Sequence, residues 1–179
     1  MYAGALNRKP TFVEYASDHQ LVIGGAMLES SRTLFARNFV ERAEFAARCQ
    51  ANTTPESFVD AVIQNVQIAG VDLSGERANL IGSYNRGDNV VESRAEVVRA
   101  IADNAAFKQS QYNAAFVLSE YFSYLRRDPD RAGYQFWLIV LNNSGPDNYH
   151  AMVCAFITST EYQRRFSQVV SHSNSECAQ

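Results

Sequence analysis

Apolar residues recur along this chain at helical spacing, and caps or turn residues separate the segments. One typical segment opens at Thr54-Pro55, a pair that predicts a helix start, and ends near Gly70. Its apolar positions are Phe58, Val59, Val62, Ile63 and Val66. No stretch alternates apolar and polar residues as a half-buried strand does. The pattern therefore predicts an all-α fold, with helices of about three turns joined by short loops.

A polar turn joins two strongly apolar helices in the last third of the chain. Asp128 is predicted to cap the second helix, because its side chain can accept a hydrogen bond from a free backbone N–H. Pro129 would then stand at the first helical position, where the missing N–H has no partner to lose. Asp130 adds negative charge to the same first turn, which suits the positive end of the helix dipole.

The same aspartates allow a second interpretation, a calcium-binding loop. The order Asp128-x-Asp130-x-Ala132-Gly133 resembles the start of an EF-hand. The fifth position is Ala132, however, and the twelfth is Ile139, where an EF-hand needs a bidentate Glu. We therefore expect a cap and a turn, and neither a metal nor a cofactor.

The helix after the turn carries its large apolar residues close together. Trp137, the only Trp in the protein, stands next to Phe136 and one turn after Gly133. Val140 and Leu141 continue the apolar side, which we expect to face the core. Trp137 is thus predicted to be largely buried.

A short pattern occurs three times. An apolar residue is followed six places on by an aromatic one, with a polar pair between them, at Phe39–Phe45, Ile101–Phe107 and Phe156–Tyr162. Matching turns, Leu6–Pro10 and Leu125–Pro129, precede the first and third copies. We therefore predict a single globular domain of stacked, degenerate helical repeats over 1–167. The repeats would cover residues 2–49, 54–107 and 112–167, with a polar tail at 168–179.

Composition and charge restrict the classes of function that this protein can have. The 179 residues are 46% hydrophobic and 20% charged, which is typical of a globular protein. A net charge of -3 without a basic run argues against nucleic-acid binding. No apolar stretch approaches the roughly 20 residues that a membrane-spanning helix needs. The first residues lack the pattern of a signal peptide, so we expect a processed or partial chain.

Three cysteines, Cys49, Cys154 and Cys177, leave two interpretations open. All three are idle or buried thiols, or Cys154 and Cys177 form a disulfide that fixes the polar tail. In the second case Cys49 stays a free, buried thiol. A disulfide would also indicate an oxidising compartment.

Catalytic motifs are missing from the sequence. The three histidines (His19, His150 and His172) do not have the spacing of a metal-binding pair, and no Gly-x-Ser-x-Gly is present. We expect no enzyme activity. Tyrosines near loops are candidates for a contact surface, since aromatic residues are enriched at interfaces. These candidates are Tyr112, Tyr134 and Tyr149.

The run Tyr124–Leu138 resembles the signature of the bacterial DUF4214 family, in which a Gly-Arg-x-Pro-like turn leads to Gly-x-x-(Phe/Tyr)-Trp. The run Met152–Phe166 is similar to that family's later Phe-x-x-Ser-x-Glu-(Phe/Tyr) element. Arg126 departs from the signature, because it stands where the family usually has Gly. The ending of the chain resembles that of acidobacterial members. The signature residues here are Asp128, Pro129, Asp130, Gly133, Tyr134, Phe136 and Trp137.

The resemblance implies export, because DUF4214 domains of unknown function occur in large exported or cell-surface bacterial proteins. Their unit is also distantly similar to the repeat domain of phycobilisome linkers, which holds other proteins together. We therefore expect a non-catalytic interaction or scaffold module, whose partners are other protein subunits or copies of itself. The alternative is a carbohydrate- or small-ligand-binding domain that uses exposed tyrosines. An apolar surface patch would favour the first, and an aromatic-lined pocket the second.

Overall fold

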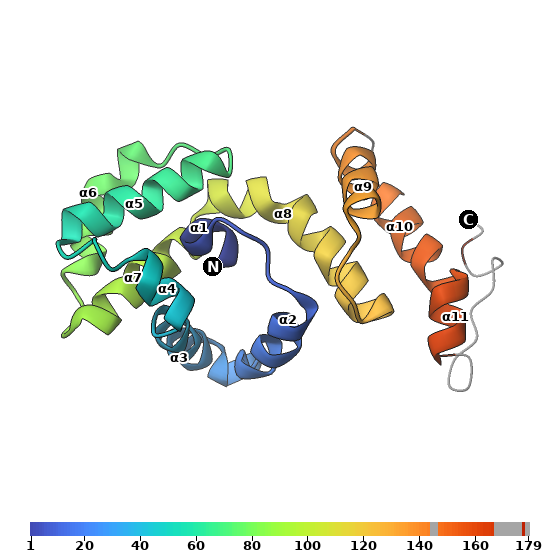
Figure 1. Cartoon of the computed structure of the whole chain (residues 1–179), viewed down its shortest axis with the longest axis horizontal. Helices are drawn as coiled ribbons and strands as arrows, with labels where there is room; N and C mark the ends of the chain where they lie inside the picture. The colour runs from blue at the N-terminus through green and yellow to red at the C-terminus, as the bar shows by residue number, and fades with distance from the viewer. Residues whose placement is uncertain (144–146, 167–176, 178–179) are drawn as a thin grey trace. The chain divides into compact units, whose positions relative to one another are not determined.

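The computed structural model describes residues 1–143, 147–166 and 177 (Figure 1). These residues are helical nearly throughout and contain no strand, which confirms the predicted all-α class. Contacts divide the chain into two compact units, Met1–Ser110 and Gln111–Gln179. The borders predicted for the three repeats and the tail stay a prediction. No helix in the described part of the chain is long and apolar enough to span a membrane.

The first unit packs helices around one aromatic core. In chain order its elements are α1 (Tyr2–Leu6), α2 (Phe12–Asp18), η1 (His19–Leu21), η2 (Gly25–Met27), α3 (Leu28–Val40), α4 (Ala43–Arg48), α5 (Pro55–Ile68), η3 (Ser74–Glu76), α6 (Arg77–Tyr84), α7 (Val90–Asp103) and the start of α8 (Ala105–Glu120). Helix α7 packs against α3 and α6, and α1 packs against α5. Buried rings contact one another in a chain through this core: Tyr2, Phe39, Phe45, Phe58 and Tyr84.

The second unit begins within α8 and continues into a π-helical turn. Its further elements are η4 (Tyr121–Leu125), the π-helix, and then α9 (Arg131–Asn143), α10 (Asp147–Ile157) and α11 (Thr160–Phe166). Its core contains apolar and aromatic side chains from all of these elements: Val117, Leu118, Tyr121, Phe122, Leu125, Tyr134, Leu141, Met152, Phe156 and Tyr162.

The pattern that occurs three times in the sequence has one structural counterpart, a break between two helices. The breaks separate α3 from α4, α7 from α8, and α10 from α11. The Asn104 side chain accepts a hydrogen bond from the Phe107 N–H at 3.0 Å. Ser159 accepts one from the Tyr162 N–H at 3.1 Å. The apolar and aromatic ends of all three patterns are buried, so each break directs two side chains into a core.

The two matching turns share a backbone conformation. Asn7 ends α1 with φ 46° and ψ 41°, and Arg126 ends η4 with φ 48° and ψ 44°. Both values lie in the left-handed region, which Gly and Asn adopt more easily than Arg. The backbone requires a positive φ at position 126. This requirement explains why the family signature has Gly where this chain has Arg126.

The helix that follows the second turn begins later than predicted. The Asp130 carboxylate accepts a hydrogen bond from the Gly133 N–H at 2.8 Å, so Asp130 caps α9. Thr11 caps α2 in the same way, through the Glu14 N–H. The predicted cap at Asp128, with Pro129 as the first helical residue, is wrong. Asp130 is an equally good capping residue, and it lies three positions before the N–H that it accepts from.

Candidate functional site

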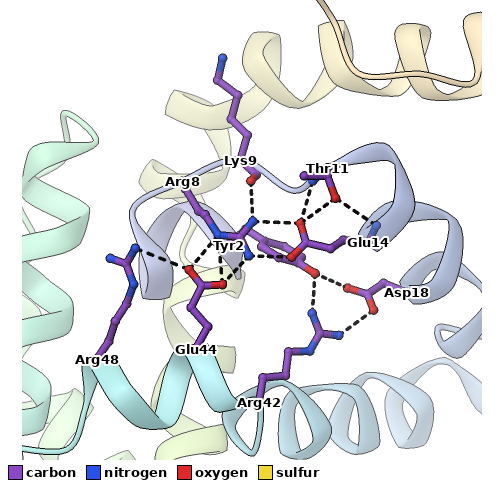
Figure 2. A network of polar contacts seen from close by, with 9 residues as sticks. All are labelled: Tyr2, Arg8, Lys9, Thr11, Glu14, Asp18, Arg42, Glu44 and Arg48. Carbon is purple, nitrogen blue, oxygen red and sulfur yellow. Dashed lines mark hydrogen bonds and ion pairs between the residues drawn. The ribbon is translucent and has the colours of Figure 1, made fainter.

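Figure 2 shows a polar network of the first unit, built around the α1–α2 turn. We call it the first arginine cluster, and its members are Tyr2, Arg8, Glu14, Asp18, Arg42 and Glu44. Three segments supply these residues: the α1–α2 region, the break between α3 and α4, and α4 itself.

Arg8 joins three of these side chains. Its guanidinium group donates to Glu14 at 2.6 Å and, through Nε, to Glu44 at 2.9 Å. It also lies 5.1 Å from the centre of the Tyr2 ring. Glu44 stands 36 residues after Arg8, so this contact ties α4 back to the start of the chain.

A second arginine binds the other side of Tyr2. The Tyr2 hydroxyl donates to Asp18 at 2.6 Å and accepts from Arg42. Arg42 also pairs with Asp18 at 2.6 Å and lies over the Phe39 ring, 4.9 Å from its centre. Arg42 has an extended backbone at the break between α3 and α4, and this break brings its side chain to α2.

The electrostatics of the cluster hold its groups in fixed protonation states. The hydrogen bonds from Arg8 lower the pKa of Glu14 to about 2 and also lower the pKa of Glu44. Burial, followed by the hydrogen bond to Asp18, raises the pKa of the Tyr2 phenol. At neutral pH the two glutamates are ionised and Tyr2 is protonated. The arrangement is thus suited to fixing geometry, because a general acid or base needs a pKa near the working pH.

The second unit contains a smaller version of this arrangement, the second arginine cluster (Tyr121, Arg127, Asp130 and Glu161). Arg127 donates to Glu161 at 2.7 Å and lies 5.2 Å from the centre of the Tyr121 ring. Asp130 lies 3.9 Å from Arg127. Glu161 stands 34 residues after Arg127, close to the separation of 36 in the first cluster.

The two clusters share their central contacts. Tyr2 meets Phe39 edge to face with ring centres 5.1 Å apart, and Tyr121 meets Phe156 in the same way at 4.9 Å. A left-handed residue precedes each central arginine, and a capping residue follows three positions after it. The two clusters therefore share one arrangement of contacts, while the repeat that the sequence suggests stays a prediction.

The signature residues of α9 divide between the core and the surface. Tyr134 and Leu141 are buried, and Trp137 is half-buried against the Phe156 ring. Phe136 is 57% exposed and Ile139 is 61% exposed, so the prediction that Phe136 faces the core is wrong. The inward side of α9 follows the spacing from 134 to 137 and 141, and position 136 falls outside that stripe. The prediction for Trp137 holds only in part.

The three candidate tyrosines do not form one contact surface. Tyr112 is 54% exposed and meets half-buried Tyr149 edge to face, with ring centres 5.9 Å apart. Tyr149 also packs on Phe116 and donates a hydrogen bond to Asn113. Tyr134 is buried, so its prediction as a surface residue is wrong: it belongs to the inward stripe of α9.

The predicted disulfide joins Cys154 of α10 to Cys177, with Cα atoms 5.7 Å apart. The structure thus confirms this pairing over the interpretation of two idle thiols. Cys49 is a free, buried thiol, and burial raises its pKa. The remainder of the predicted tail, residues 168–176 and 178–179, lies outside the described residues.

Two cavities, of about 130 and 450 Å³, lie beside the ion pair of Arg37 with Glu92, between α3 and α7. Charged and small side chains line most of their walls, and neither cavity has an aromatic lining residue. Among the described residues, no group of three or more His, Cys, Asp or Glu could hold a metal ion. The Asp130 carboxylate is instead occupied as a helix cap.

Sequence reasoning identified the two turns but missed the ionic partners of their arginines. Arg8 and Arg127 each stand two positions after a buried leucine, and Glu44 and Glu161 each precede the aromatic end of a repeated pattern. A comparison of these paired positions could have suggested an Arg–Glu contact. Glu120 was also missed, because a single glutamate at a helix end is usually solvated.

The fold is all-α, and each of its two compact units contains an arginine–glutamate cluster with similar contacts. Residues 101–166 match the family model of DUF4214, a domain of unknown function. The match contains the whole second arginine cluster, whereas the first cluster lies before it. No curated protein and no solved structure matches the chain.

Proposed function

We propose that this protein is a non-catalytic interaction module that binds other protein subunits, or copies of itself, in an exported bacterial assembly. The observation that carries the proposal is a set of exposed apolar side chains from η1 to the first residue of α3. We call this set the apolar connector: Leu21, Ile23, Met27 and Leu28, which are 44%, 53%, 55% and 38% exposed.

The Ser31 side chain holds the backbone of the connector in place. Ser31 is buried, and its hydroxyl accepts from the Ile23 N–H at 3.0 Å and lies within hydrogen-bond distance of the Ile23 and Leu28 carbonyl groups. α2, η1 and η2 contain no buried residue, so the exposed side chains of the connector lie outside the core. A fixed backbone that presents apolar side chains to solvent is typical of a protein-binding surface.

The chemistry of the clusters supports a structural rather than a catalytic role. Arg8 and Arg127 are each paired with carboxylates, and the groups around them keep fixed charges near neutral pH. Export is supported by the disulfide of Cys154 with Cys177, since such bonds persist in oxidising compartments. The DUF4214 resemblance to exported proteins supports the same assignment.

Sedimentation over a range of protein concentrations tests binding between copies of the chain. The test variant is Ile23→Ser with Met27→Ser, and the matched control is Ile68→Ser, because Ile68 is 63% exposed but lies on α5. We expect the wild type and the control to associate with rising concentration and the double variant to stay monomeric. Equal association of all three would exclude the connector as the binding surface.

A further inference from the structure

The disulfide has a histidine beside one of its two sulfur atoms. His150 stands one helical turn before Cys154 on α10, and its Nε2 atom lies 3.7 Å from the Cys154 Sγ atom. His150 is exposed, and both cysteines are partly exposed. Small molecules in solution can therefore reach the bond.

The position of the imidazole makes the two sulfur atoms chemically unequal. In thiol–disulfide exchange a thiolate attacks one sulfur, and the other sulfur leaves as a thiolate. The better leaving group is the one whose thiolate is more stable, and a protonated histidine stabilises a neighbouring thiolate. Because His150 contacts Cys154, Cys154 is the favoured leaving group, and an incoming thiolate is directed to Cys177.

We propose that Cys154–Cys177 is an exchange site for small-molecule thiols, in which His150 assists the departure of Cys154. The incoming thiolate forms a new S–S bond with Cys177, the Cys154–Cys177 bond breaks, and its electron pair leaves on Cys154 beside the imidazolium of His150. One disulfide is consumed and one is formed, so the step needs no further oxidant or reductant. The reverse attack by Cys154 restores the original bond.

Cys49 provides an internal reference for this assignment. It is 5% exposed, and burial raises the pKa of its thiol, so it is protected from the same thiols. His19 provides a matched reference for the histidine. It lies in the first unit, where its ring stacks on Tyr15 and its Nδ1 atom lies 2.9 Å from the Tyr15 carbonyl oxygen.

The test treats the folded protein with glutathione near pH 6.5. Acid quenching, alkylation of free thiols and peptide mass spectrometry then locate the glutathione. We expect it mainly on Cys177, with Cys154 alkylated and Cys49 unmodified by glutathione. The variants His150→Gln and His19→Gln are treated in parallel, and circular dichroism checks that both are folded.

The two variants separate assistance by the imidazole from simple access to Cys177. His150→Gln should slow formation of the mixed disulfide roughly threefold or more, the size that a Brønsted coefficient of about 0.5 gives for one pKa unit. His19→Gln should leave the rate unchanged. Glutathione mainly on Cys154, or an unchanged rate in His150→Gln, would overturn the proposal.

Discussion

The hydroxyl group of Tyr121 occupies the space that a Cβ atom on Gly133 would need. This contact brings the Tyr121 hydroxyl against the first turn of α9, while the ring lies next to Arg127 and Phe156. It gives the glycine of the family signature a physical reason, since any larger side chain collides with the central tyrosine of the second arginine cluster.

Gly133→Ala should therefore lower the free energy of unfolding, although alanine favours helices. We expect a loss of about 1–3 kcal/mol, the usual cost of overpacking, measured by denaturant unfolding. Gly82 is the matched control, because it lies in α6 with no atom near its Cβ position. Gly82→Ala should stabilise by about 0.5–1 kcal/mol. A stabilised Gly133→Ala variant would contradict the contact with Tyr121.

Arg126 holds a left-handed conformation that costs a non-glycine residue free energy. Arg126→Gly should raise the free energy of unfolding by about 0.5–1 kcal/mol, because the strain relieved exceeds the entropy that glycine adds to the unfolded chain. The gain is limited by the lost contact of Arg126 with the Phe166 ring. Asn7→Gly is the control and should be nearly neutral, since Asn tolerates this conformation. Destabilisation by Arg126→Gly would show that the ring contact is worth more than the strain.

Glu120 makes stability depend on pH. It ends α8 at 8% exposure, its Oε2 atom has no hydrogen-bond partner among the described residues, and burial raises its pKa from 4.5 to about 7. The folded state thus binds the Glu120 proton more tightly than the unfolded state does. The contribution of this proton to the free energy of unfolding is complete below pH 4.5 and is lost as the pH rises through about 7.

Glu120→Gln should abolish that loss, because an amide cannot ionise. We expect the variant to be more stable than the wild type by about 1–3 kcal/mol at pH 8, and close to it at pH 5, by guanidinium unfolding. The glutamates paired with arginine have lowered pKa values and affect stability only at more acidic pH. The same pH dependence in both proteins would exclude Glu120 as its source.

The disulfide should stabilise the second unit. Replacing Cys154 and Cys177 together by serine should lower the free energy of unfolding by about 3 kcal/mol, because the bond closes a loop with a sequence separation of 23 residues. The wild type in a strong reductant should show the same loss, which separates the effect of the bond from that of the serines. Equal stability of the bonded and reduced forms would contradict a stabilising role.

Local signals made much of the fold predictable. Thr54 and Pro55 begin α5 as predicted, and the repeated apolar–aromatic pattern marks three helix breaks. The cysteine pair was also found from the sequence, because a cysteine in a polar tail has no packing reason to be there. Each of these signals lies within a few residues or concerns a residue type with few possible roles.

The arginine clusters could not be derived in this way, because they depend on contacts between distant residues. Arg8 meets Glu44 only after the break between α3 and α4 has turned the chain back. The error at Phe136 has a similar origin. Its neighbour Trp137 reaches the core, and which of two adjacent aromatic residues turns inward depends on where the rest of the unit lies.

The proposal that the apolar connector binds another protein chain is tested most directly by site-specific photo-crosslinking in cells that export the protein. A photoreactive residue replaces Met27 in one variant and Ile68, a slightly more exposed apolar position on α5, in the other. We predict one discrete crosslinked protein, either a second copy or another subunit, from position 27 and none from position 68. No adduct at position 27, or the same adducts at both positions, would contradict the proposed function.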